Sequence, residues 1–339
     1  MDYFIQLISK NWQRHGNYSG YEKIIPNLTI NYKIVKYFSI LFPIAKKLKS
    51  RTQLKNYSTV ALSKELKILF KLPINKTIFI LYGDMDYYYL HFLKRGILKL
   101  LNNQLIVTFH HPPQEIEKRL NYNRKLVLGS IDKIIVMGPN QIPFFKKYTN
   151  AAIKFIPHGI DTDYFKPLNN IKKNNEILII GVSHRDHQRN ITIIKMMNDC
   201  NITFKIVMPK ESAKLYSNLK NVDIITERID DKTLLNFYQS SKAILLSLVD
   251  CTASNTILEA IATGCPLVVN NVGAVKDYIP TESDIPVFKS NDIEDQVNYI
   301  RKIIEDEDFA SSISKKQRIL ALNYDWKIIS KITENFILN

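Results

Sequence analysis

The chain has 339 residues, 45% of them hydrophobic and 23% charged, and this length predicts about two domains that can each bury a core. Its three cysteines, Cys200, Cys251 and Cys265, show no paired spacing, which argues against a disulfide framework or a zinc site. No secretory signal pattern and no apolar run of roughly 20 residues is present. We therefore expect a cytoplasmic protein, soluble or peripheral on the inner face of the membrane.

The positive charge is concentrated in the first half of the chain. Residues 1–150 contain 24 Lys and Arg against 8 Asp and Glu, a net charge of +16, whereas residues 151–339 contain 23 against 24, a net charge of −1. This excess indicates either a solvated lysine-rich surface or contact with an anionic membrane. We expect no nucleic-acid partner, because no helix-turn-helix, RNP-type or zinc-finger pattern accompanies the charge.

Short apolar runs rich in Ile and Val alternate with helical segments along the whole chain, a pattern typical of parallel strands that are covered on both faces. The predicted strands are 3–8, 77–82, 104–109, 133–138, 176–182, 203–208, 222–226, 243–248 and 266–270. This alternation predicts an α/β protein with two doubly wound parallel sheets. The polar stretch 169–176 is predicted to be a linker, and helices are expected at 231–241 and 325–338.

Residues 31–51 are the best candidate for a membrane-binding helix. Apolar residues such as Val35, Phe38 and Leu41 recur at helical spacing, and lysines lie mostly opposite them. Pro43 should break or kink such a helix. Packing of the same residues in the protein core explains the pattern equally well.

The stretch 243–269 predicts a buried strand, a loop, a short helix and a second strand, with Glu259 at the start of the helix. Ligands of open α/β sheets bind beyond the carboxyl ends of the strands, and residues 250–259 should lie there. Near the N-terminus, Gly16 and Gly20 flank a loop whose backbone could approach a phosphate or an acceptor, although an ordinary βα turn explains it nearly as well.

Three stretches together resemble the GT-B glycosyltransferases of family 4 type. They are "IPHGIDTDYFKP" (156–167), "SNTILEAIATGCPLVVNNVGAVKDYI" (254–279) and "YDWKIISKI" (324–332). The resemblance implies two Rossmann-like domains facing across a cleft. It places an acceptor domain at 1–160, a sugar-nucleotide domain at 161–324, and a C-terminal helix at 325–339 that packs back toward the first domain.

The resemblance also implies roles for residues around the predicted helix. Glu259 matches the carboxylate that binds the donor ribose, a role that suits a group able to accept two hydrogen bonds. The family's usual first Glu is replaced by Cys251, and the neighbouring Asp250 is a possible substitute, which makes both catalytic candidates. Alternatively, backbone N–H groups together with Ser254 and Asn255 hold the donor sugar. Thr256 completes this set of donor-site residues.

Further positions carry over from the family in the same way. In "GVSHRDHQRN" (181–190), Gly181 matches a family glycine, and Arg185 and Arg189 lie where the family grips the donor diphosphate. His110 aligns with a histidine that faces the sugar. The pair His110 and His111 is not expected to bind a metal, because no carboxylate or cysteine stands at ligand spacing on the same turn.

The sequence thus predicts a glycosyltransferase that uses a UDP- or GDP-linked sugar, with retention of anomeric configuration and without a metal. The expected acceptor is a glycolipid or a growing polysaccharide at an anionic membrane surface. Two alternatives remain open. One is a sugar-nucleotide epimerase of the same fold, and the other is a catalytically weak sugar-nucleotide-binding protein, which the replacement at Cys251 suggests.

Overall fold

The computed structural model describes the whole chain except residues 1–4, 9–15, 53–56, 121–122 and 169–170. The chain divides into two compact units. The first comprises residues 1–13, 21–158 and 329–339, and the second comprises residues 14–20 and 159–328. The division between His158 and Gly159 falls two residues before the boundary drawn from the sequence.

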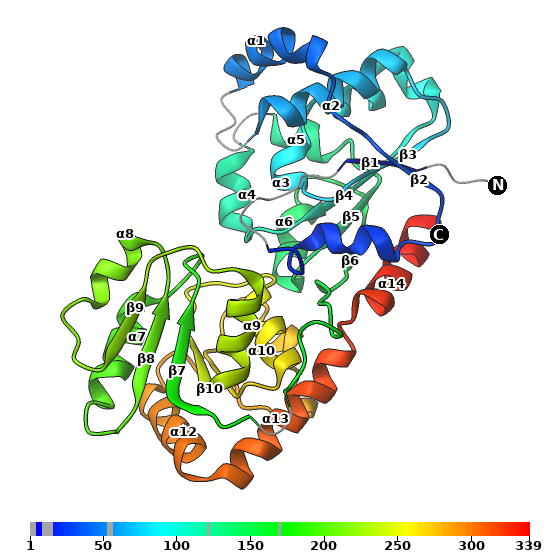
Figure 1. Cartoon of the computed structure of the whole chain (residues 1–339). Helices are drawn as coiled ribbons and strands as arrows, with labels where there is room; N and C mark the ends of the chain where they lie inside the picture. Colours follow the sequence, from blue (N-terminus) through cyan, green and yellow to red (C-terminus); the bar gives the residue numbers. More distant parts are fainter. Residues whose placement is uncertain (1–4, 9–15, 53–56, 121–122, 169–170) are drawn as a thin grey trace. The chain divides into compact units, whose positions relative to one another are not determined.

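The first unit is built on a six-stranded sheet in which all neighbouring strands are parallel, in the order β2-β1-β3-β4-β5-β6 (Figure 1). The strands are β1 (Ile5–Ile8), β2 (Tyr32–Ile34), β3 (Thr77–Ile80), β4 (Gln104–Phe109), β5 (Lys133–Val136) and β6 (Ala152–Phe155). The sequence predicted four of them and missed β2 and β6. Both missed strands lie at the edges of the sheet and are largely exposed, so they lack the continuous apolar run of a buried strand.

Helices cover both faces of this sheet. They are α1 (Phe42–Thr52), α2 (Thr59–Lys71), α3 (Gly83–Asp86), α4 (Pro113–Arg119), α5 (Arg124–Leu128), α6 (Ile142–Lys146) and α14 (Trp326–Leu338), with the 3₁₀ helices η1 (Tyr21–Asn27), η2 (Ser39–Leu41), η3 (Tyr89–Lys94), η4 (Gly96–Leu101) and η5 (Pro139–Gln141). The last turns of α14 belong to this unit, because Glu334 accepts hydrogen bonds from the backbone and hydroxyl of Thr29 and Lys133 Nζ donates to the Ile337 carbonyl at 2.9 Å.

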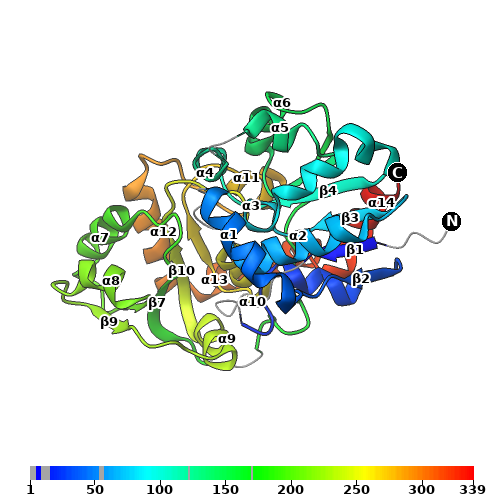
Figure 2. The same ribbon diagram turned by 90° about the horizontal axis from the view of Figure 1, so that it is seen from above.

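The helix expected over residues 31–51 is wrong in its first half. Residues 32–34 form β2, and α1 begins only at Phe42 and lies along α2 (Figure 2). Pro43 occupies the first turn of α1, where a missing N–H costs nothing, so it starts a helix instead of breaking one. The apolar residues are divided as well, since Val35 is buried whereas Phe38 is exposed.

The second unit contains a five-stranded parallel sheet in the order β11-β10-β7-β8-β9 (Figure 1). The strands are β7 (Asn174–Ile180), β8 (Thr203–Val207), β9 (Val222–Ile225), β10 (Ser241–Leu246) and β11 (Leu267–Val269). All five were predicted, which confirms the parallel α/β class. The predicted linker over 169–176 is wrong at its end, because β7 already begins at Asn174.

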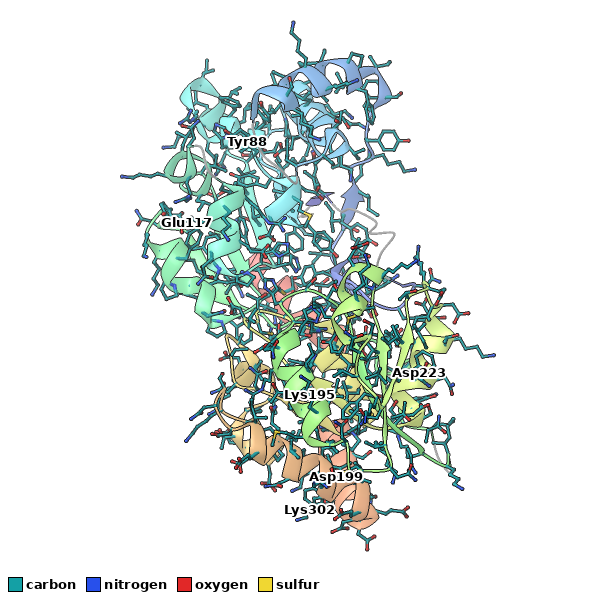
Figure 3. The ribbon with its side chains drawn as sticks, turned by 90° about the vertical axis from the view of Figure 1, so that its left-hand side faces the viewer. Tyr88, Glu117, Lys195, Asp199, Asp223 and Lys302 are labelled. Carbon is teal, nitrogen blue, oxygen red and sulfur yellow. The ribbon has the colours of Figure 1, made fainter. Side chains whose placement is uncertain are left out.

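Helices also cover both faces of the second sheet. They are α7 (His187–Met196), α8 (Lys210–Ala213), α9 (Asp231–Ser240), α10 (Asn255–Thr263), α11 (Val275–Tyr278), α12 (Ile293–Glu305) and α13 (Glu307–Leu322), with η6 (Lys214–Tyr216) and η7 (Thr281–Ser283). Alternate strand residues such as Ile177 and Ile179 pack with α7 and α12 in one core, while α9 and α10 contact β10 on the other side. In Figure 3, Asp199 after α7 and Lys302 on α12 lie at the same end of this unit, where Arg301 pairs with Asp199 at 2.8 Å.

Two doubly wound parallel sheets are thus present, as the GT-B class requires. Within the described residues, no helix is long and apolar enough to cross a membrane.

Candidate functional site

Two loops of the second unit meet at the carboxyl end of its sheet. One follows β7 and the other follows the neighbouring strand β10. Backbone hydrogen bonds join them, from Asp186 N to the Ser247 carbonyl at 3.0 Å and from Val249 N to the His184 carbonyl at 2.9 Å. The chain leaves β7 for β8 on one side, while β10 lies on the other side, so this is the point where the strand order reverses. Ligands of doubly wound sheets bind at such a point.

Arg185 lies at the centre of this junction. Its Nε and Nη2 atoms donate to the Ile180 carbonyl at 3.1 and 2.9 Å, and Nη2 also donates to Thr256 Oγ1 at 3.0 Å. Gly181 makes this possible, because it has a φ of +83° and a Cβ there would lie 2.6 Å from Nη2. Burial lowers the Arg185 pKa, but a guanidinium keeps its charge at neutral pH. The structure therefore brings together Gly181, Arg185 and Thr256, all three predicted for the donor site.

The N-terminus of α10 points into the same junction. Helix α10 begins at Asn255, and Ser254 is its N-cap with an extended backbone but no capping hydrogen bond from its side chain. The first N–H groups of such a helix lack partners within the helix and attract anions. The two predicted residues Ser254 and Asn255 thus lie at a helix N-terminus of the kind that attracts anions, and their role on a donor stays a prediction.

Glu259 lies in the second turn of α10, so the prediction that it starts the helix is wrong. Its carboxylate is buried and accepts two hydrogen bonds, from Ser19 Oγ to Oε1 at 2.6 Å and from Tyr238 OH to Oε2 at 2.8 Å. Burial and the adjacent carboxylate raise the Tyr238 pKa well above its usual value, so the phenol stays a donor. The carboxylate is therefore presented with both oxygens already bonded to hydroxyl groups, the same type of partner that a ribose offers.

Sequence reasoning missed Ser19 and Tyr238. Ser19 belongs to the segment Gly16–Gly20, which groups with the second unit although it follows β1. Its neighbour Tyr18 stacks on Tyr164, with ring centroids 3.4 Å apart and planes 3° from parallel. A Cβ on Gly16 would lie 1.7 Å from the carboxylate of Asp231, and Gly20 ends the segment with a φ of +104°. Both predicted glycines thus let this segment approach α9 and α10 closely.

Asp250 and Cys251 form the turn between β10 and α10. Burial raises the pKa of the Cys251 thiol to about 12, so it stays protonated at neutral pH and is unsuited to act as a nucleophile. Asp250 Oδ1 accepts the Cys251 N–H at 2.7 Å, and the Cys251 carbonyl accepts from Ala274 N at 2.8 Å. Gly273 permits this contact, since a Cβ there would lie 2.1 Å from the Cys251 carbonyl. Whether Asp250 replaces the family's first Glu stays a prediction.

Arg189 is not brought together with Arg185. It lies on α7, is almost fully buried, and its Nε donates to Gln296 Oε1 at 2.8 Å. Its other nitrogens donate to the carbonyls of Ser290 and Lys289, which precede α12. This arrangement ties α7 to α12, and the role of Arg189 on the donor diphosphate remains a prediction that its present contacts do not favour.

His110 follows β4 in the first unit. Its Nε2 lies 2.7 Å from the Leu81 carbonyl, so this nitrogen carries the hydrogen. Its backbone N–H donates to Asp84 at 2.7 Å, and its ring stacks on Tyr82 with centroids 4.7 Å apart. The ring is thereby fixed at the carboxyl end of the sheet, and its orientation toward a sugar stays a prediction.

A carboxylate does lie near the histidine pair, contrary to the expectation from the sequence. That expectation relied on the absence of a carboxylate at ligand spacing, but Glu115 lies four residues after His111, and its Oε2 is 3.5 Å from His111 Nδ1. Such a contact is an ordinary ion pair when the histidine is protonated, and the expectation that no metal is needed stays a prediction.

Comparison with known proteins gives a family match over part of the chain. Residues 168–319 match the model of the family described as Glycosyl transferases group 1. Residues 168–319 thus form a domain that is similar to the group 1 glycosyltransferases. All predicted donor-site residues of the second unit, from Gly181 to Glu259, lie inside this domain, and the family predicted from the sequence is confirmed.

Among curated proteins, the chain is 24% identical over 187 residues to sulfoquinovosyl transferase SQD2 of Arabidopsis thaliana. The matched region covers 50% of this chain and only 36% of that relative. Two solved structures share the fold over nearly their whole lengths. Sucrose-phosphate synthase of Thermosynechococcus elongatus has a TM-score of 0.69 at 14% identity, with 98% of both chains covered. Alr3699/HepE of Anabaena, in complex with UDP and glucose, has a TM-score of 0.66 at 12% identity, with 99% of both chains covered.

Proposed function

We propose that this protein is a glycosyltransferase that moves a sugar from a UDP- or GDP-linked donor to a glycolipid or polysaccharide acceptor. The observation that carries the proposal is that helix α10 bears the buried Glu259 carboxylate and also, at Thr256, accepts a hydrogen bond from the Arg185 cation at the junction of β7 and β10, within the region that matches the group 1 model. A carboxylate suits ribose hydroxyls, and a guanidinium with helix N–H groups suits a diphosphate. Relatives of the same fold are described in complex with UDP and a sugar.

The proposed reaction retains the anomeric configuration and needs no metal. The leaving diphosphate would be stabilised by Arg185 and by the N-terminal N–H groups of α10, which supply positive charge where negative charge develops. His110, in the first unit, is proposed to contact the sugar. A contact of the basic first unit with an anionic membrane on its cytoplasmic face is part of the same proposal, and it is supported by the net charge of +16 over residues 1–150.

The test begins with thermal unfolding of the protein in the presence of UDP, GDP and a panel of their sugars, each with and without a chelator. We expect one nucleotide sugar to raise the unfolding temperature regardless of the chelator, and NMR of the transfer product to show the donor's anomeric configuration. Conversion of the donor without any acceptor would instead indicate an epimerase. Donor binding without transfer to any saccharide or lipid acceptor would indicate a sugar-nucleotide-binding protein. No response to any nucleotide would refute the proposal.

A further inference from the structure

Five large apolar side chains of the first unit are exposed at two adjoining places in the fold. Phe70 lies in the last turn of α2, Leu72 and Ile74 follow this helix, and Ile97 and Leu100 lie on η4. Ile97 and Leu100 are 78% and 79% exposed, the highest values of any large apolar side chain in the described part of the chain. We call these five residues the apolar surface. Contiguous exposed apolar groups of this kind mark contact sites.

The two places are held side by side by hydrogen bonds between their loops. Asn75 N donates to the Leu101 carbonyl at 2.8 Å, and Lys76 N donates to Asn103 Oδ1 at 3.0 Å. The Asn103 side chain donates in turn to the Pro73 carbonyl at 2.6 Å. On η4 itself, residues three apart are eclipsed, so Ile97 and Leu100 stand on the same edge. The apolar residues of α2 and η4 therefore form neighbouring parts of one surface.

The backbone presents one of these side chains at a cost. Leu72 is the C-cap of α2 and has a φ of +42°, in the left-handed region where glycine is the usual residue. A leucine at this position loses stability, and its side chain is half exposed, so burial does not compensate. Backbone strain that no burial of the side chain offsets points to a function of the exposed side chain.

Cations surround the apolar surface. Lys71, Arg95 and Lys99 are exposed, and each is adjacent in sequence or within two residues of an apolar member. Across residues 66–104 the acidic residues are Asp84 and Asp86, and both are buried. The stretch 66–104 thus exposes apolar groups and cations without an exposed acidic side chain, while the adjacent Asp132 is paired with Lys94 at 2.7 Å.

We propose that this apolar surface and its three cations bind an anionic lipid bilayer, with Ile97, Leu100 and Leu72 inserted at the level of the headgroups. This inference rests on the membrane contact of the proposed function and names the surface that makes it. Lipid of negative charge complements both features, because the apolar groups gain burial and the cations gain attraction to the headgroups. A second copy of the chain fits less well, since a twofold interface would bring the three cations against their own equivalents.

The site differs from the one that the sequence favoured. The predicted membrane helix lay over residues 31–51, but its lysines Lys46, Lys47 and Lys49 are on α1 and not on the apolar surface. The two locations can therefore be separated by substitution. Ile319, on α13 of the second unit, is 67% exposed and provides a matched apolar control.

The experiment is co-sedimentation of the full chain with vesicles of phosphatidylcholine alone, or of equal parts phosphatidylcholine and phosphatidylglycerol, at low and physiological salt. We expect the wild type to bind the anionic vesicles, less at higher salt, and to bind the neutral vesicles poorly. Lys71→Gln/Arg95→Gln/Lys99→Gln should weaken binding by on the order of a hundredfold, at about fivefold for each cation. Ile97→Ser/Leu100→Ser should weaken it by about tenfold or more. Ile319→Ser should bind like the wild type.

The inference would be overturned if the triple variant of Lys71, Arg95 and Lys99 and the double variant of Ile97 and Leu100 both bound the vesicles as well as the wild type does. If only Lys46→Gln/Lys47→Gln/Lys49→Gln lost binding, the membrane contact would lie on α1 instead. Absence of vesicle binding by the wild type would overturn the inference together with the proposed membrane contact. The inference would also be overturned if the wild type bound no vesicles but formed a dimer that Ile97→Ser/Leu100→Ser dissociates. UDP and GDP binding, measured on all variants, should stay unchanged, so a failure of the nucleotide-sugar function is seen separately. Unchanged thermal unfolding confirms that the variants fold.

Discussion

Replacement of Glu259 by glutamine is the sharpest test of the donor site. The carboxylate accepts from Ser19 at Oε1 and from Tyr238 at Oε2. Tyr238 is completely buried on α9, whereas Ser19 lies on a half-buried segment. We therefore expect the ribose hydroxyls to take the place of Ser19 and the Tyr238 bond to persist. Glutamine keeps the shape of the side chain and one acceptor oxygen for Tyr238, so the fold should survive.

The expected loss follows from the charge of the acceptor. A hydrogen bond to a charged group contributes about 1.5–3 kcal/mol, and the amide replaces the carboxylate oxygen that faces the donor with an N–H₂ group. The dissociation constant of the donor nucleotide should therefore rise by about 10- to 150-fold. Glu259→Ala should also weaken donor binding, but it leaves the buried Tyr238 hydroxyl without its acceptor and destabilises the unit as well.

The assay is isothermal titration calorimetry with the nucleotide that stabilises the wild type, together with thermal unfolding of each variant. Tyr238→Phe is the matched control, because it removes a bond to the same carboxylate but leaves both oxygens as acceptors. We expect it to change donor affinity by less than about fivefold, the size of a neutral hydrogen bond. A folded Glu259→Gln protein that binds the nucleotide as tightly as the wild type would refute the ribose assignment.

Four other outcomes are expected. Ser19→Ala should tighten donor binding by about fivefold, because the donor no longer displaces a hydroxyl from the carboxylate; weaker binding in calorimetry would mean that Ser19 supports the bound state. Asp250→Asn should cut turnover while Cys251→Ser leaves it nearly intact, and the reverse result in a transfer assay would assign the role to the cysteine position. Arg189→Lys should lower the unfolding temperature, since a lysine cannot reach three acceptors in a fork, with donor affinity changed by less than about threefold; a large affinity loss would restore its diphosphate role. Burial raises the Glu65 pKa from 4.5 to about 7, so the folded state holds its proton more tightly than the unfolded chain, and the free energy of unfolding should fall by about 3 kcal/mol as pH rises through this range. Glu65→Gln should remove that slope in urea titrations, and an unchanged slope would show that the carboxylate is ionised in the fold.

The parallel strands were predictable because a strand that is buried on both faces has apolar residues at successive positions. Strands β7, β8, β10 and β11 of the second sheet follow this rule over much of their length, whereas the edge strand β9 is only partly buried and was predicted from its Val and Ile residues. The predicted ends of the five strands differ from the observed ones by a few residues. Strand β6 does not follow the rule, since its four residues are only partly buried at the edge of the sheet. The segment 31–51 failed for a related reason. The helical spacing of the apolar residues is a local pattern that does not include contacts with distant parts of the chain. Here residues 32–34 pair with β1 as strand β2, and this pairing imposes an extended backbone on them.

In the candidate site, too, contacts between residues close in the sequence were predictable, whereas contacts between distant residues were not. The proximity of Gly181 and Arg185 was predictable because their relation is local, within one turn after a strand, and a glycine at that position has a direct steric reason. The contacts of the Arg189 side chain were not predictable, because a sequence does not say toward which neighbour a buried helix residue points. Its direction is set by Gln296, more than a hundred residues away in the chain.

The contact between Ser19 and Glu259 is the most distant in sequence of these, since 240 residues separate the two side chains and no motif links them. The family motif identified a carboxylate that suits a ribose, but the structure shows this carboxylate already bonded at both oxygens. Of the two partners, Tyr238 is fixed by burial on α9, while Ser19 belongs to a short segment held by a ring stack and by contacts with Asp231. Donor binding to Glu259 would therefore involve an exchange of one hydroxyl partner for another. Such an exchange costs about 1 kcal/mol for the lost Ser19 bond, the same cost that Ser19→Ala should remove. It also lets the segment Gly16–Gly20 respond directly to the presence of the nucleotide.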